Sequence, residues 1–208
     1  MIGNASDYSE AALFEKELSL ARTPSSMKPL GSLAPDFSLP DVVTGKLVAR
    51  DEVAGAKGLL VMFICRHCPF VKHVQDELAR LGRDYAGGDI GIVAISANDE
   101  SGFPEDRPEK LAEMSTELGF RFPFLFDGSQ EVAREYDAQC TPDFFVFDAS
   151  RRLVYRGQLD DSRPESGIPV TGRDLRAALD NLIAGRPIST DQRASLGCNI
   201  KWKAANST

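Results

Sequence analysis

Apolar residues follow two different periods along the middle of the chain, and their alternation predicts an α/β fold. Residues 58–64, GLLVMFI, form a continuous apolar run that is typical of a strand covered on both faces. From residue 68 to about 85 the apolar residues recur instead at helical spacing. Residues 90–96 then predict a second buried strand.

The second half of the chain repeats this alternation. Helices are predicted over 107–118, 130–136 and 171–184, and strands over 124–126, 144–147 and 153–157. The last helix opens on TGRD, a capping box with Asp in place of Glu, and closes at Gly185. The last two strands are expected to pair as a hairpin. The pattern therefore predicts a central mixed β-sheet flanked by helices.

Three segments are expected. Residues 1–28 form an N-terminal extension with a short helix over 9–20, residues 29–185 form the domain, and residues 186–208 form a polar tail. A small hairpin is predicted from 37–39 and 46–49, around a TG turn. The tail carries Cys198 and is expected to pack on the domain through Ile200 and Trp202. We therefore expect Cys198 to be part of this packing. The alternative is that Cys198 acts as a resolving thiol.

Composition narrows the possible functions. The 208 residues are 42% hydrophobic and 26% charged, which fits one globular domain with a core. The net charge of −7 argues against binding to nucleic acid. No apolar run approaches the ~20 residues of a membrane span, and the N-terminus has neither a basic nor an apolar segment, so we expect no membrane association and a cytoplasmic protein. In a reducing cytosol, four cysteines indicate redox chemistry or metal rather than a disulfide scaffold.

The strongest chemical signal is the segment VMFICRHCPF, in which Cys65 and Cys68 stand at the junction of a buried strand and a helix. A thiolate at a helix N-terminus faces unpaired N–H groups and the positive end of the helix dipole, which lowers its pKa. Pro69 fits the first helical position, so Cys68 is the expected N-cap and nucleophile, and Cys65 its expected partner. Nearby positive charge is predicted from Arg66, His67 and Lys72.

Two other interpretations of these cysteines stay open. Buried thiols can act simply as small hydrophobic groups. A zinc or copper site could recruit Cys65, Cys68, Cys140, Cys198 or His73, although no second CxxC or paired His supplies regular ligand spacing. We expect no bound metal and no cofactor.

The order of several segments resembles the thioredoxin superfamily. The chain is most similar to the redoxin branch, the alkyl hydroperoxide reductase/thiol-specific antioxidant class, and within it to a peroxiredoxin-like group with a CxHCP motif. The matching segments are APDFSLPDV with TGK, VMFICRHCP, FDGSQEVAREYDAQCTPDFFVFD, YRGQLDD and LGCNIKWK. The resemblance implies a thioredoxin-like fold.

The resemblance also implies roles for residues outside the CxxC motif. Pro142 would be the cis-proline facing the nucleophile, with Cys140 and Thr141 beside Cys68. An exposed backbone there could pair with a partner chain. Cys140 is the next candidate partner if Cys65 cannot reach Cys68.

The chain departs from thioredoxins at three positions. His67 replaces the usual Trp, Val71 the second cysteine, and Met62 the buried acid. It also departs from peroxiredoxins, because Val61 and Cys65 stand where those enzymes carry Pro and Thr, and Thr141-Pro142 stands where they supply an Arg. Donors that would stabilise a peroxide transition state are therefore missing.

The sequence thus predicts a thiol–disulfide oxidoreductase or thiol-dependent antioxidant protein. His67 could hold or donate a proton, or be a surface residue. The expected partners are a protein or small-molecule disulfide, or a peroxide, and a thiol reductant; a homodimer is possible. The alternatives are a copper- or zinc-delivery protein and a weak peroxiredoxin-like peroxidase. His73 and the acidic stretch 99–109 are expected to be solvated. Asp160-Asp161 are expected to be solvated turn residues, and the alternative is that they cap a loop near the active-site face.

Overall fold

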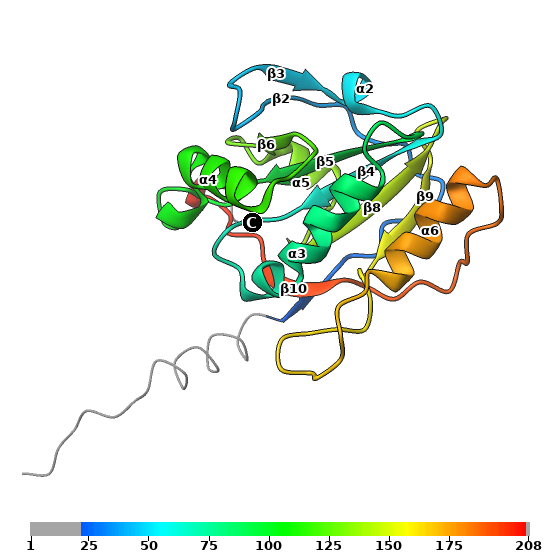
Figure 1. The fold of residues 1–208 in the computed structure, drawn as a ribbon. Coiled ribbons are helices and arrows are strands. Elements are labelled where there is room, and N and C mark those ends of the chain that lie inside the picture. Colours follow the sequence, from blue (N-terminus) through cyan, green and yellow to red (C-terminus); the bar gives the residue numbers. More distant parts are fainter. Residues whose placement is uncertain (1–21, 207–208) are drawn as a thin grey trace, which may run out of the picture.

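The computed structural model describes residues 22–206, which build a five-stranded mixed sheet with helices on both faces (Figure 1). The strand order is β6-β5-β4-β8-β9. The strands are β4 Gly58–Phe63, β5 Ile90–Ser96, β6 Phe124–Phe126, β8 Asp143–Asp148 and β9 Leu153–Gly157. β4, β5 and β6 are parallel, whereas β8 pairs antiparallel with both β4 and β9. The predicted mixed sheet with its terminal hairpin is confirmed.

Two cores lie on the two faces of the sheet. Alternate residues of β4 point to opposite faces, so Leu60 and Met62 enter one core while Val61 and Phe63 enter the other. The first core is covered by α3 Pro69–Asp84, α4 Pro108–Leu118 and α6 Arg173–Ile183, and Figure 1 shows α3 and α6 across the front of the sheet. The second is covered by α5 Glu131–Glu135 and the N-terminal hairpin. Burial on both faces explains why β4 is apolar throughout.

An ion pair ties the two front helices together. Glu77 of α3 is almost fully buried, and its Oε1 lies 2.5 Å from Nε of Arg176 in α6. Its Oε2 lies 2.6 Å from Nε of Arg80. Both carboxylate oxygens of this buried acid are therefore paired, as a buried charge requires.

The N-terminal hairpin forms as predicted. β2 Ser38–Pro40 and β3 Leu47–Ala49 pair antiparallel, and the short helix α2 Arg50–Val53 follows. The helix expected over 9–20 lies outside the described residues.

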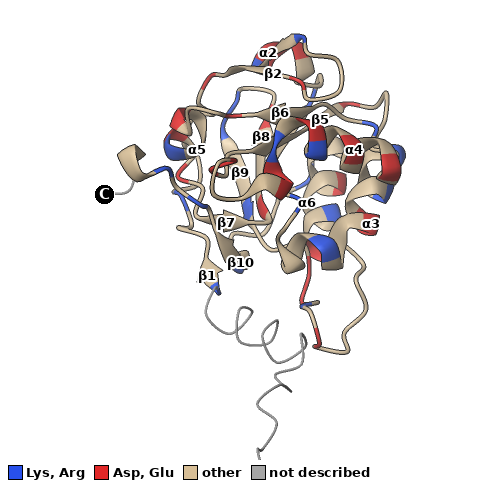
Figure 2. Cartoon of the chain, turned by 90° about the vertical axis from the view of Figure 1, so that its left-hand side faces the viewer, with Lys and Arg blue, Asp and Glu red and all other residues tan. Residues whose placement is uncertain are grey.

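A second, three-stranded sheet joins the two ends of the described chain. β10 Leu196–Asn199 lies between β1 Thr23–Pro24 and β7 Cys140–Thr141 and is antiparallel to both, and Figure 2 shows the three strands side by side. The tail is held further by Ile200, which is buried, and by Trp202, which packs against the second core. The described part of the N-terminal extension and the tail thus complete a sheet next to the domain.

The start of α6 differs from the prediction. The helix begins at Arg173 rather than 171, and its N-cap Gly172 makes no side-chain cap, so the expected TGRD capping box is wrong. Oδ2 of Asp160 accepts the N–H groups of Thr171 at 2.6 Å and of Gly172 at 2.7 Å instead. Asp160 is buried, so the expectation that it is solvated is wrong too. A carboxylate from the preceding loop replaces the local cap.

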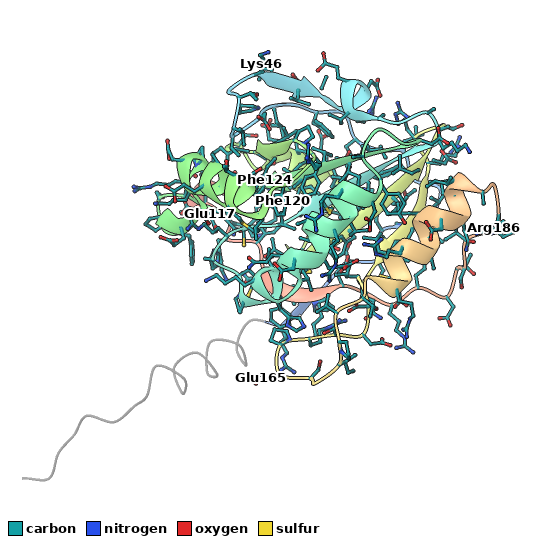
Figure 3. All side chains as sticks on the ribbon, viewed as in Figure 1. Lys46, Glu117, Phe120, Phe124, Glu165 and Arg186 are labelled. Carbon is teal, nitrogen blue, oxygen red and sulfur yellow. The ribbon has the colours of Figure 1, made fainter. Side chains whose placement is uncertain are left out.

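Surface features add little to the functional picture. Acidic and basic residues are interspersed over α3, α4 and α6 (Figure 2). The loop between β9 and α6 projects from the body, with Glu165 at its tip (Figure 3).

Between residues 22 and 206, no helix combines the length and the apolar character that crossing a bilayer needs. The 3-10 turns η1 Pro104–Asp106 and η2 Ala204–Asn206 complete the described elements.

Candidate active site

Cys68 stands at the N-cap of α3, where β4 delivers the chain to the helix. Pro69 occupies the first helical position, where its missing N–H costs no hydrogen bond. The sulfur of Cys68 lies 3.1 Å from the carbonyl oxygen of Thr141, the residue before the cis peptide bond to Pro142. Cys65 and Cys68 are both free and fully buried. The expected nucleophile therefore lies at the helix start and beside Pro142, but beneath the surface.

Hydrogen bonds favour ionisation of Cys68 despite its burial. Burial alone opposes the thiolate, but the combined hydrogen bonds outweigh it and hold the pKa of Cys68 well below the ordinary value for cysteine. The donors to its sulfur are the thiols of Cys198 and Cys65, the hydroxyl of Thr141 and the backbone N–H of Val71. A negative sulfur at the start of a helix also faces the positive end of the helix dipole.

The two neighbouring thiols are held in the protonated form. The pKa of Cys65 is raised by its complete burial and then by its hydrogen bond to Cys68. The pKa of Cys198 is raised first by its hydrogen bond to Cys68 and then by burial. The cluster therefore combines one thiol with a lowered pKa, Cys68, and two neighbouring thiols with raised pKa values, Cys65 and Cys198.

Beside Cys65 lies a histidine–carboxylate pair. His67 Nδ1 is bonded to Oδ2 of Asp106, and the same nitrogen lies 3.8 Å from the sulfur of Cys65. The backbone N–H groups of Arg66 and His67 donate to Oδ1 of Asp106 at 2.8 Å and 3.1 Å. Asn98 donates to Oδ2 at 2.8 Å. His67 is thus a positioned side chain rather than a free surface residue.

Asp106 is a site residue that the sequence interpretation missed. It lies in the acidic stretch 99–109, which was expected to be solvated, yet it is completely buried. Burial opposes its ionisation, but hydrogen bonds from His67 and Asn98 outweigh burial and lower its pKa. The signal that could have found it is topological, because parallel β4 and β5 end at the same edge of the sheet.

The same residues meet the distance requirement for a metal site. Cys65, His67 and Asp106 offer ligand atoms that lie within 4.8 Å of one another. Their hydrogen bonds to each other and to the backbone already account for this cluster, since both oxygens of Asp106 accept bonds from protein donors.

The residues around Pro142 divide between the site and the core. Thr141 contacts both cysteines of the motif, through its carbonyl to Cys68 and through Oγ1, which lies 3.3 Å from the sulfur of Cys65. The sulfur of Cys140 lies 3.7 Å from the carbonyl oxygen of Pro142, and burial raises its pKa. Cys140 is thus a buried neighbour with no bond to another thiol.

His73 lies on the other side of Pro142. Its Nε2 lies 2.7 Å from the hydroxyl of Ser162, and it lines a pocket with Phe70, Pro142 and Leu159. Burial lowers the pKa of His73. It was expected to be solvated and is instead partly exposed, because Ser162 of the loop after β9 contacts it.

A family model for redoxins matches residues 29–171, more than half of the chain. The chain belongs to the redoxin family. Among the solved structures that the chain resembles is a peroxidoxin from Mycobacterium tuberculosis, at TM-score 0.56 and 20% identity, covering 76% of this chain and 97% of that one; this likeness shows the fold alone. The resemblance and the fold class predicted from the sequence are confirmed.

Nearer relatives of this redoxin have names that state no activity. A crystal structure of an uncharacterized conserved protein from Geobacillus kaustophilus superposes at TM-score 0.86 with 53% identity, over 88% of this chain and 97% of that one. A hypothetical protein from Sinorhizobium meliloti superposes at TM-score 0.85 with 48% identity, over 88% of this chain and 99% of that one.

A curated Mycobacterium tuberculosis protein has a name that does state an activity. This protein, named "Putative peroxiredoxin", is 30% identical over 109 residues, which are 52% of this chain and 63% of the relative. The match thus spans less than two thirds of that relative.

Proposed function

We propose that this redoxin is a thiol–disulfide oxidoreductase in which the thiolate of Cys68 attacks the substrate and Cys65 completes the exchange. One observation carries the proposal. Hydrogen bonds lower the pKa of Cys68 while burial raises that of Cys65, so a nucleophile stands beside a protonated thiol three residues earlier in the chain. A thiolate at Cys68 can begin the exchange, and a protonated Cys65 stays unreactive until the second step.

In the first step the Cys68 thiolate attacks one sulfur of a substrate disulfide. An S–S bond forms between Cys68 and that sulfur, and the other substrate sulfur leaves as a thiolate. Once Cys68 is uncharged, it no longer raises the pKa of Cys65. Cys65 then passes its proton to the pair of His67 and Asp106 and attacks Cys68, which releases the second substrate thiolate. The substrate gains two electrons, and an external thiol reductant restores Cys65 and Cys68.

Disulfides suit this site better than peroxides. Among the described residues, the hydrogen bonds to the Cys68 sulfur come from thiols, a hydroxyl and a backbone N–H, and none comes from a guanidinium. A peroxide transition state develops charge on the leaving oxygen, which a strong cationic donor would stabilise. Peroxide reduction is therefore proposed as a slower side activity.

Thiolate absorbance near 240 nm tests the assignment of the nucleophile without requiring a reagent to reach the buried sulfur. The reduced wild-type protein should show an absorbance step well below the ordinary cysteine pKa. Cys68→Ser should remove this step. Cys65→Ala should keep it but move it to higher pH, because one donor to the thiolate is lost. A low-pH step that survives in Cys68→Ser would overturn the proposal.

A further inference from the structure

The C-terminal strand brings a third thiol to the nucleophile. β10 pairs with β7 in the register that sets Cys198 opposite Thr141, whose carbonyl oxygen lies 3.1 Å from the sulfur of Cys68. Cys198 and Cys68 lie in the same buried cluster, close enough for each thiol to shift the pKa of the other. Two residues from distant parts of the chain, Thr141 and Cys198, therefore enclose the same sulfur, and the backbone edge expected to receive a partner chain is occupied by the protein's own tail.

Close approach of β10 depends on a glycine. A Cβ atom added to Gly197 would lie 2.0 Å from the carbonyl oxygen of Thr141, a contact that backbone atoms cannot accommodate without moving apart. The absence of a side chain at residue 197 thus allows the next residue, Cys198, to reach Cys68. The tail is held on the other side of this contact by buried Ile200.

We propose that Cys198 is a second resolving thiol, which captures Cys68 after the Cys68 thiolate has reacted with a small disulfide and so ties β10 over the site. The inference rests on the proposed function, since it requires Cys68 to be the nucleophile. It extends that function because β10 would be covalently linked to Cys68 in the oxidised protein and held only by packing and hydrogen bonds in the reduced protein.

The chemistry balances with a small disulfide as the oxidant. With glutathione disulfide, the Cys68 thiolate forms a mixed disulfide and releases one glutathione thiolate. Cys198 loses its proton to that thiolate and attacks the Cys68 sulfur, which forms the Cys68–Cys198 disulfide and releases the second glutathione. Two protein thiols are oxidised and one glutathione disulfide is reduced to two thiols. A thiol held beside the mixed disulfide reacts within the molecule, so it should outrun capture by solution thiols.

Cys65 and Cys198 compete for the same sulfur, so the test removes Cys65. Full-length Cys65→Ser protein, reduced and then exposed to glutathione disulfide, should release two glutathiones per chain, and non-reducing peptide mapping should find Cys68 joined to Cys198. Cys65→Ser/Cys198→Ser should stop after one glutathione, with the mixed disulfide left on Cys68. Cys65→Ser/Cys140→Ser is the matched control, because Cys140 lies next to β10 but its sulfur contacts Pro142; it should behave like Cys65→Ser.

A second variant keeps the thiol and moves the strand. Gly197→Ala in the Cys65→Ser background should slow closure of the Cys68–Cys198 disulfide severalfold, because the added Cβ forces β10 away from Thr141. Rates unchanged by Gly197→Ala would overturn the geometric basis of the inference.

The failures of the two proposals are distinguishable. If Cys68 forms the mixed disulfide in Cys65→Ser but Cys198 stays free and alkylatable, the inference about Cys198 is overturned while the nucleophile stands. If Cys65→Ser/Cys198→Ser forms no mixed disulfide at Cys68, the proposed function fails, and the role of Cys198 fails with it.

Discussion

Asp143 should make the stability of this protein fall as the pH rises through the neutral range. Its carboxyl is completely buried next to Pro142, and burial raises its pKa to about 7, against hydrogen bonds from Ser25, Gln139 and Ser195. In the described part of the chain its Oδ1 has no hydrogen-bond partner. The folded protein therefore holds a proton that the unfolded chain has already lost above an ordinary pKa of 3.8.

The sign and the size follow from proton linkage. Between the two pKa values the folded state binds more protons than the unfolded state, so the free energy of unfolding decreases as the pH rises and levels off above pH 7. The full difference corresponds to about 4 kcal/mol, of which about 2.5 kcal/mol falls between pH 5 and pH 8. Asp143→Asn cannot ionise and should lack this contribution.

Urea denaturation followed by the fluorescence of Trp202 measures the effect. The free energy of unfolding of Asp143→Asn minus that of the wild type should increase by about 2.5 kcal/mol from pH 5 to pH 8. A pH-independent cost of burying the amide would change the mutant's free energy of unfolding equally at pH 5 and pH 8, so it does not affect the predicted increase. Groups that titrate elsewhere contribute equally to both proteins and cancel when the wild-type value is subtracted. Parallel pH curves for the two proteins would refute the reasoning, because they would mean that Asp143 ionises alike in both states.

Three further predictions concern other parts of the structure. Glu77→Gln should lower the free energy of unfolding by about 2–3 kcal/mol, because it leaves Arg176 and Arg80 without their shared buried acid; a loss below about 0.5 kcal/mol in urea denaturation would contradict this. Asp106→Asn in a Cys68→Ser background should lower the pKa of Cys65, because a nearby negative charge is removed; an unchanged thiolate titration at 240 nm would argue against that coupling. Metal analysis of protein purified without oxygen should find far less than one zinc or copper ion per chain, whereas stoichiometric metal that disappears in Cys65→Ser would favour the metal-delivery alternative.

Local patterns predicted the parts of the site that depend on neighbouring residues. The strand, turn and helix around the CxxC motif are encoded by a buried apolar run, a Pro at the first helical position and helical spacing thereafter, all within one continuous segment. The likeness to redoxins added Pro142 and Thr141; Thr141 stands 73 residues after Cys68. These placements need no knowledge of how loops are arranged.

The residues that were missed depend on such loop arrangements. Asp106 reaches the site because its loop leaves β5 at the edge where β4 ends, and nothing in the acidic composition of 99–109 distinguishes a buried carboxylate from solvated ones. Cys198 was named only as an alternative resolving thiol, and it lies near the site because a tail without helical or alternating periodicity runs back as β10. Asp160 was misjudged for the same reason, and His73 is only partly exposed because Ser162 of the loop after β9 contacts it.

The pairing of β10 with both β1 and β7 has a consequence for handling the protein. A shortened version that stops after α6 would leave two strands with unpaired N–H and C=O groups, one of them beside the sulfur of Cys68. Open edges of this kind recruit other chains. Such a truncation should associate with itself through these open edges, which makes β10 a practical requirement for preparing the monomeric protein.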